Sequence, residues 1–184
     1  RFAEEELDVA CVKWEPLSAT AVVMDPMTGE VLAMANYPSY DPNHFMKYPL
    51  KNRRNFAVTD CYEPGSVMKP IVISGVFEQG LVRPDNVIFC NNGVCVLDGR
   101  ILHDTHGGHG NLTVSEVVSY SSNIGMAKLG LLMGNERMYN YLKQFSFGEK
   151  TGIELPGEIG GIFRPLKQWS KKYSLISISI GHEI

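Results

Sequence analysis

The sequence has no block of like charge and no long apolar run. Its 184 residues carry 17 Lys and Arg against 20 Asp and Glu, a formal net charge of -3, so it lacks the basic face that binding to nucleic acid requires. No stretch approaches the roughly 20 apolar residues of a membrane-spanning helix, and none resembles a secretory signal peptide. Since 44% of the residues are hydrophobic and 20% are charged, the composition predicts a globular chain with a sizeable core.

Cysteine is scarce, and its spacing excludes the common metal motifs. The four cysteines, Cys11, Cys61, Cys90 and Cys95, form no CxxC pair, so neither a zinc knuckle nor a thioredoxin-type motif is expected. Cys90 and Cys95 flank a turn-like stretch that would place the two sulfurs across a hairpin. The spacing alone leaves a disulfide and two free thiols equally open.

Neither end of the sequence has a polar tail. A helix predicted over residues 1–14 is already under way at Arg1, and the chain stops shortly after an apolar, serine-interleaved segment at residues 173–180. We therefore expect residues 1–184 to be a segment cut from a longer chain.

Turn signals divide the first half of the chain into short elements. Two β-rich runs, residues 20–24 and 30–35, are joined by a turn cluster and predict a hairpin. Residues 36–49 are dense in proline, asparagine and aspartate and predict an irregular loop. Residues 84–111 predict short strands and loops. The sequence shows no internal repeat and no low-complexity tract.

A helix is predicted from Ser66 to Gln79, after a Pro-Gly pair and before the stop signal Gly80. Apolar residues occur on every side of it, so we expect it to be buried all round. Pro70 falls in the first helical turn, where its missing N–H would have no intrahelical partner in any case.

Two further helices are predicted on either side of a short break. A Thr-x-x-Glu capping box predicts a helix over residues 113–120, and helical spacing resumes over residues 124–134. The break between them consists of Ser121, Ser122 and Asn123.

Ser66 and Lys69 are the first candidates for chemistry. Three residues apart, they lie on one face of a helix, so Lys69 can reach the Ser66 hydroxyl. A buried lysine whose pKa falls toward neutrality can take the proton of a serine nucleophile, and the helix N-terminus favours a developing oxyanion. The alternative is a capping serine and a surface lysine, because the bare Ser-x-x-Lys spacing is common.

Ser121 and Asn123 are the second candidates. A hydroxyl and an amide in a tight connection can relay a proton and hold a substrate amide. The alternative is ordinary helix-break and capping chemistry, for which serine and asparagine are both suited.

Together, Ser-x-x-Lys at the start of an apolar helix and Ser-x-Asn between helices match the active-site serine penicillin-recognising enzymes. The wider sequence resembles the transpeptidase domain of class B penicillin-binding proteins, the septum-division members most of all and the spore-cortex relatives next. The segments that carry this resemblance are residues 25–35, 38–43, 54–60, 63–66 and 152–158.

The resemblance implies an α/β (α+β) fold of the penicillin-binding protein and serine β-lactamase type. This transpeptidase sandwich is an antiparallel sheet with helices on both faces, and its C-terminal strands are absent from this stretch. Residues 1–184 would then be a single partial transpeptidase domain.

The resemblance also implies a peptidoglycan D,D-transpeptidase that cross-links stem peptides ending in D-Ala-D-Ala and is acylated by β-lactams. Ser66 would be the nucleophile, Lys69 its base, Ser121 a proton relay and Asn123 the group that binds the substrate amide. No metal or organic cofactor is needed. The family implies cell-division membrane proteins as partners and a site on the outer face of the bacterial cytoplasmic membrane, held by an N-terminal anchor outside this sequence.

Two other functions stay open. A serine β-lactamase or D,D-carboxypeptidase would pass the acyl group to water, although nothing in the sequence indicates a deacylating carboxylate beside Ser66. A non-catalytic division scaffold or binding module would use the same fold without chemistry.

The third motif of the family, Lys-Thr/Ser-Gly, has the same residue types as Lys150, Thr151 and Gly152. We do not assign them to it, because Pro156 and the surrounding glycines favour a loop over a strand that faces the nucleophile. The resemblance places the third motif beyond residue 184.

His103, His106 and His109 repeat every three residues, a spacing that invites a zinc site. The glycines between them provide no fixed scaffold, so we expect a loop and no metal. The resemblance places this loop before the Ser-x-Asn helix.

Overall fold

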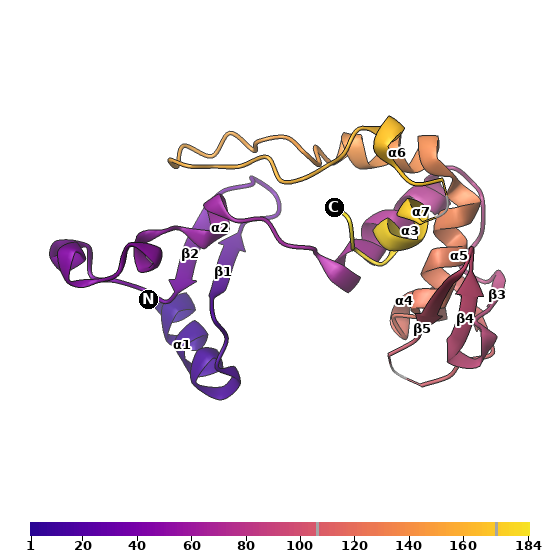
Figure 1. Cartoon of the computed structure of the whole chain (residues 1–184), viewed down its shortest axis with the longest axis horizontal. Helices are drawn as coiled ribbons and strands as arrows, with labels where there is room; N and C mark the ends of the chain where they lie inside the picture. The colour runs from indigo at the N-terminus through magenta and orange to yellow at the C-terminus, as the bar shows by residue number, and fades with distance from the viewer. Residues whose placement is uncertain (106, 172) are drawn as a thin grey trace. The chain divides into compact units, whose positions relative to one another are not determined.

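The computed structural model describes residues 1–105, 107–171 and 173–184. The chain forms two compact units, Arg1–Cys61 with Gly152–Ile159 and Tyr62–Thr151 with Gly160–Ile184 (Figure 1). In the part of the chain that is described, no helix is both long and apolar enough to cross a membrane.

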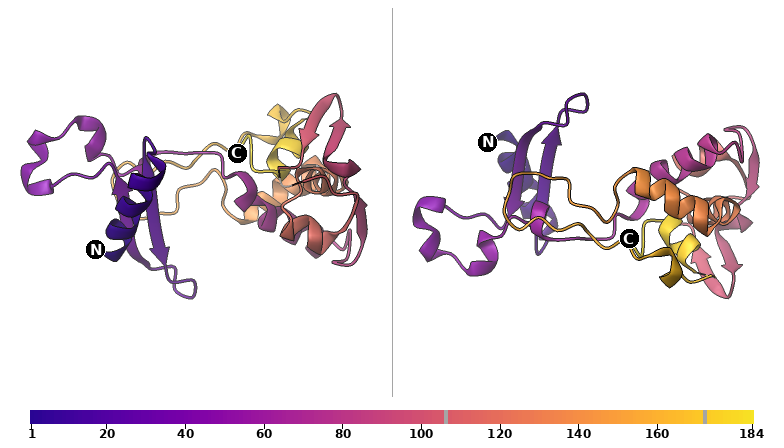
Figure 2. Two further views of the ribbon diagram at one scale, coloured as in Figure 1. Left: turned by 90° about the horizontal axis from the view of Figure 1, so that it is seen from below. Right: turned by 90° about the horizontal axis from the view of Figure 1, so that it is seen from above.

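The first unit is built on a helix and a hairpin. α1 (Phe2–Trp14) lies against the antiparallel pair β1 (Ala19–Met24) and β2 (Val31–Tyr37), as the views in Figure 2 also show. The turn between the strands is held by Asp25, whose Oδ1 accepts hydrogen bonds from the backbone N–H groups of Met27 and Thr28 at 2.7 and 3.1 Å. The predicted helix and hairpin are confirmed.

The loop after β2 contains only short helical turns, as the sequence predicts. Two 3₁₀ turns (Pro42–Lys47 and Leu50–Arg53) precede α2 (Phe56–Thr59). Asn36 fixes the end of the loop, because its Nδ2 donates to Asn55 Oδ1 at 2.9 Å.

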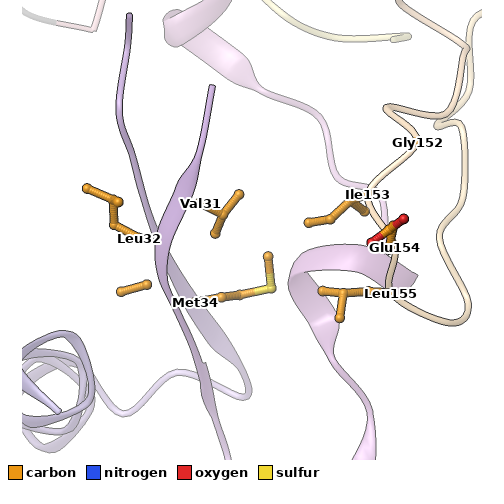
Figure 3. A pocket seen from close by; sticks show the side chains of 8 residues that line it. Val31, Leu32, Met34, Gly152, Ile153, Glu154 and Leu155 are labelled. Carbon is orange, nitrogen blue, oxygen red and sulfur yellow. The ribbon is translucent and has the colours of Figure 1, made fainter. Parts of the chain in front are cut away.

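A pocket in the first unit lies between β2 and the segment at residues 152–155 (Figure 3). Apart from Glu154, its lining residues are apolar or glycine. Such a lining offers no pair of groups for acid–base chemistry.

The second unit is organised around α5 (Asn123–Met133). This helix contacts α3 (Lys69–Glu78), α4 (Val114–Ser119), α6 (Asn135–Gln144) and α7 (Ser174–Ser179), and Figures 1 and 2 show these helices gathered around it. Most of the α5 residues are buried. The core of the unit is therefore helical, and α5 crosses its middle.

Short strands cover one part of this helical core. β3 (Val87–Phe89) pairs with β6 (Asn111–Thr113), and β4 (Val94–Leu97) pairs with β5 (Arg100–His103), both antiparallel. Within the described ranges, the strands of the chain thus form three separate two-stranded antiparallel sheets. The predicted mixture of helices and antiparallel strands is confirmed.

The helix boundaries agree with the capping and stop signals, except at the start of α3. The capping box at Thr113 and Glu116 is formed, and α5 ends at Met133 with Gly134 as its C-cap. The segment predicted as one helix from Ser66 instead begins as a 3₁₀ turn over Gly65–Met68, and α3 starts at Lys69.

Helix α6 (Asn135–Gln144) is absent from our sequence interpretation. Its buried side chains, Met138, Tyr141 and Leu142, follow the three- and four-residue spacing of an amphipathic helix. That spacing was the signal available in the sequence.

All four cysteines are free thiols, which decides the alternative that the sequence left open. Cys90 and Cys95 are both buried. The Cys90 thiol donates to Ile88 O at 3.7 Å, and burial raises its pKa.

Close contact between α5 and α7 requires a small residue at Gly130. A Cβ atom at this position would lie 1.8 Å from Ser179 Oγ and 3.2 Å from Leu175 O. Ser179 is itself buried and donates its hydroxyl to Leu175 O at 2.6 Å. Ser179 thus serves as a small buried residue whose hydroxyl bonds to its own helix.

We predict that Gly130→Ala lowers the free energy of unfolding by about 1–3 kcal/mol, because α7 must move away from α5. Chemical denaturation measures this change. Leu132→Ala is the matched control on the same helix, because Leu132 is 51% exposed and its truncation should change stability by less than about 0.5 kcal/mol. Equal stability of Gly130→Ala and wild type would contradict the packing described.

Candidate active site

Ser66 lies on a short turn whose backbone is held by a distant segment. Gly65, with φ of 60°, donates its N–H to Gly181 O at 2.9 Å. A Cβ atom at Gly181, where φ is 80°, would lie 1.9 Å from Gly65 O, so only glycine fits there. The Ser66 side chain is exposed. The turn therefore presents a hydroxyl on a backbone that the two glycines fix.

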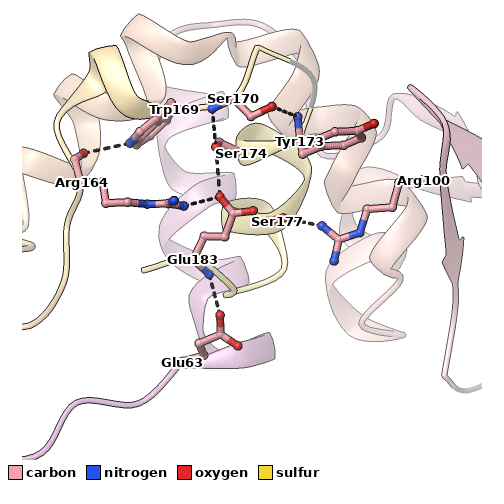
Figure 4. Close-up of polar contacts among 9 residues, drawn as sticks. All are labelled: Glu63, Arg100, Arg164, Trp169, Ser170, Tyr173, Ser174, Ser177 and Glu183. Atoms are coloured by element: carbon pink, nitrogen blue, oxygen red, sulfur yellow. Dashed lines mark hydrogen bonds and ion pairs between the residues drawn. The ribbon is translucent and has the colours of Figure 1, made fainter.

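Glu63 reinforces this attachment. Its carboxylate accepts hydrogen bonds from the Glu183 backbone N–H at 2.8 Å and from His182 Nδ1 at 2.7 Å. The bond from Glu183 and then the one from His182 lower the pKa of Glu63. The Glu183 carboxylate in turn accepts from Arg164 Nη2 and from Ser174 Oγ at 3.0 Å (Figure 4). Our sequence interpretation did not include these contacts.

Lys69 is buried at the first position of α3, with 2% of its surface exposed. Its Nζ donates to Ser121 O at 2.7 Å, to Ser121 Oγ at 2.9 Å and to Asn123 Oδ1 at 2.8 Å. Burial lowers the pKa of Lys69 from 10.5 to about 8, and the negative charge of Asp104 opposes this effect. Near neutral pH a usable fraction of the amine is therefore unprotonated.

Ser121 connects Lys69 to Ser66. It lies in the break between α4 and α5 with φ of 54°, a conformation that residues other than glycine adopt uncommonly. Its Oγ donates to Ser66 Oγ at 3.2 Å while accepting from Lys69. No hydrogen bond joins Ser66 directly to Lys69 in the described structure, so the contacts run through Ser121.

Asn123 is the first residue of α5, and both ends of its amide have a partner. Oδ1 accepts from Lys69, and Nδ2 donates to His103 O at 2.9 Å. An amide nitrogen carries two hydrogens, so a second N–H is available for a ligand. The four residues predicted from the sequence thus lie together in one connected group.

The described residues of the histidine segment do not form a metal site. His106 lies outside the described residues. His109 stacks on Tyr120 with ring centroids 4.6 Å apart. Among the residues that the structure describes, no group of three His, Cys, Asp or Glu could hold a metal ion.

The segment Lys150–Gly152 has no strand structure. This agrees with the loop that its proline and glycines predict. Lys150 is exposed, whereas Lys69 is buried.

An exposed serine hydroxyl, a second hydroxyl that bridges and a buried amine with a lowered pKa are groups that together can activate a serine as a nucleophile. Residues 19–184 match the family described as penicillin binding protein transpeptidase domain. The chain belongs to this family. The resemblance inferred from the sequence motifs is confirmed.

Individual relatives support the same membership. Stage V sporulation protein D of Bacillus subtilis is 40% identical over 167 residues, which are 90% of this chain and 26% of that protein. Peptidoglycan D,D-transpeptidase FtsI of Escherichia coli is 37% identical over 153 residues, 83% of this chain and 26% of that protein. This chain therefore spans about a quarter of these two relatives.

Solved transpeptidase structures share the fold. Penicillin-binding protein 3 of Mycobacterium tuberculosis, complexed with aztreonam, superposes with a TM-score of 0.88 at 36% identity. The match covers 98% of this chain and 40% of the solved chain. A peptidoglycan glycosyltransferase from Burkholderia ambifaria gives a TM-score of 0.86 at 35% identity, with 98% of this chain and 52% of that one covered. The predicted transpeptidase fold is confirmed.

We predict that the Lys69 amine titrates at a pH of about 8, well below exposed lysines near 10.4. NMR of side-chain ¹⁵N-labelled lysine measures this, and Lys69→Met identifies the signal. An amine that titrates together with the exposed lysines would contradict the proposed effect of burial.

Proposed function

We propose that this chain carries the nucleophile site of a peptidoglycan D,D-transpeptidase. The observation that supports this most directly is the continuous set of hydrogen bonds from Ser66 through Ser121 to the buried amine of Lys69. A surface lysine or a simple helix cap would need neither the burial nor the bridging hydroxyl.

In the proposed reaction, Ser66 Oγ attacks the carbonyl carbon between the two D-alanines of a stem peptide. The hydroxyl proton passes through Ser121 Oγ to the unprotonated amine of Lys69. As the carbon–nitrogen bond breaks, the same path returns a proton to the leaving amine, and free D-alanine departs. The ester on Ser66 is the acyl-enzyme, and Asn123 holds the substrate amide during these steps.

A second amine completes the cross-link. A side-chain amine of a neighbouring stem peptide attacks the ester carbonyl and gives up one proton, which passes through Ser121 Oγ to the Lys69 amine. Ser66 Oγ leaves and recovers its proton. The reaction needs neither a metal nor an organic cofactor, because serine and lysine supply the nucleophile and the base.

The names of the relatives support this substrate class. FtsI of Escherichia coli is named a peptidoglycan D,D-transpeptidase, and the Mycobacterium tuberculosis relative was solved with the β-lactam aztreonam. We extend both properties to this chain: it acts on stem peptides ending in D-Ala-D-Ala, and β-lactams acylate Ser66.

We also propose a role in septal or sporulation cell-wall synthesis, since the relatives include FtsI and Stage V sporulation protein D. The site would work on the outer face of the cytoplasmic membrane, where peptidoglycan is assembled, within a membrane-anchored protein that contacts other division proteins.

Labelling of the full-length protein with a fluorescent penicillin tests the function. We predict stable covalent labelling that Ser66→Ala abolishes and that Lys69→Ala slows by at least about 100-fold, the scale of a lost general base. Lys150→Ala is the matched control, because this lysine lies in the excluded Lys-Thr-Gly loop, and it should label within a few-fold of wild type.

The other outcomes identify the alternative functions. Rapid turnover of the label would indicate a β-lactamase or a carboxypeptidase, in which water takes the acyl group. Absence of labelling in the folded full-length protein would indicate a non-catalytic module. A loss in Lys150→Ala as large as that in Lys69→Ala would overturn our exclusion of that loop.

A further inference from the structure

Asp104 lies directly after β5 and faces the break between α4 and α5. Its backbone N–H donates to Gly93 O at 3.0 Å, which ties it to the 3₁₀ turn before β4. The residue is half-buried. Neither the nucleophile motif nor the Ser-x-Asn motif includes it, and our sequence interpretation assigned it no role.

The Asp104 carboxylate binds the middle residue of the Ser-Ser-Asn break. Ser122 Oγ donates to Oδ1 at 3.1 Å and to Oδ2 at 2.9 Å, and the backbone N–H of Ile124 donates to Oδ1 at 3.1 Å. Ser122 is 1% exposed and also caps α5, because its Oγ accepts from the Gly125 N–H at 3.0 Å. One carboxylate therefore fixes both the cap and the first turn of the helix.

The residue before Asp104 contacts the same break. His103 O accepts from Asn123 Nδ2 at 2.9 Å. The pair His103 and Asp104 thus binds Ser122 and Asn123, and Ser121 precedes them directly. Because Ser121 has an uncommon left-handed backbone, its side-chain direction depends on how firmly its neighbours are held.

We propose that Asp104 is a positioning residue that acts through Ser122 and the first turn of α5 to hold Ser121 and Asn123 against Lys69 and Ser66. This inference rests on the proposed acylation of Ser66. Asp104 itself touches none of the reacting atoms in that step.

The charge of Asp104 has a second, separable effect. Burial lowers the pKa of Lys69, and the Asp104 carboxylate opposes this lowering. The groups to which the Lys69 amine donates, on Ser121 and Asn123, carry no charge. The Asp104 charge also helps to raise the pKa of the Cys90 thiol, and the Lys128 ammonium, which donates to Phe89 O and Asn91 Oδ1, acts on that pKa in the opposite direction.

Three substitutions separate geometry from charge in the full-length protein. Asp104→Asn keeps the shape but removes the charge, Asp104→Ala removes both, and Ser122→Ala removes the contact while keeping the charge. Asp98→Asn is the matched control, since it removes one charge from the β4–β5 turn of the same unit. The readouts are the penicillin acylation rate against pH and the Lys69 amine titration.

The proposed acylation requires the unprotonated Lys69 amine, so the wild-type rate should rise with pH, with a midpoint at a pH of about 8. Asp104→Asn and Asp104→Ala should shift this rise to lower pH, because the opposing charge is gone. Asp104→Ala and Ser122→Ala should lower the high-pH plateau by about tenfold or more through lost positioning. Ser122→Ala should keep the wild-type midpoint, and Asp98→Asn should match wild type in both.

A high-pH plateau unchanged in Asp104→Ala would overturn the inference even if the midpoint moved, because the midpoint reports only the charge. A loss of thermal stability without a change in the plateau would also overturn it. If wild type is not acylated, the proposed function fails. The Lys69 titration and hydrogen exchange at the Ile124 and Gly125 amides then decide the inference alone. Unchanged titration and exchange in Asp104→Asn would overturn it, while a lower Lys69 pKa with faster exchange would support it.

Discussion

The site depends on burying the ammonium-bearing end of Lys69. A charged amine taken out of water must find its hydrogen-bond acceptors within the protein, and those of Lys69 lie on Ser121 and Asn123, more than 50 positions further along the chain. This requirement holds the start of α3 against the break between α4 and α5. The same burial lowers the pKa of the amine toward neutrality, so the interaction that organises the site also suits Lys69 to the proposed role of base.

Ser66, the proposed nucleophile, is positioned by a different part of the chain. The Gly65 N–H donates to Gly181 O, and Glu63 accepts hydrogen bonds from the two residues that follow Gly181. Ser66 therefore lies on a turn that hydrogen bonds to residues 181–183 hold in place, and its hydroxyl accepts a hydrogen bond from Ser121 Oγ. A fixed backbone under an exposed hydroxyl lowers the entropy that a reacting geometry would otherwise cost. The Glu183 contacts with Arg164 and Ser174 extend this support into α7 (Figure 4).

Local signals predicted much of this arrangement. Ser-x-x-Lys, Ser-x-Asn and the capping box at Thr113 are each readable within a few residues, and the structure brings the first two together. The contacts of Glu63 with His182 and Glu183 join residues about 120 positions apart, and no local pattern specifies such a pairing. The role of Asp104 could not be predicted for the same reason, since its partners Ser122 and Ile124 belong to another element. The segment before α3 forms a 3₁₀ turn, although its apolar spacing is helical, and the Gly65 N–H at its start bonds to Gly181 O, a long-range contact.

A double-mutant cycle between Lys69 and Ser121 tests most directly whether the two act as one proton path. The measured quantity is the rate of penicillin acylation of the full-length protein for Lys69→Met, Ser121→Ala and the double variant. If the proton passes from Ser66 through Ser121 to Lys69, each single substitution should slow acylation about as much as both together, because residues that act as a unit are non-additive. Losses that multiply in the double variant would contradict this account.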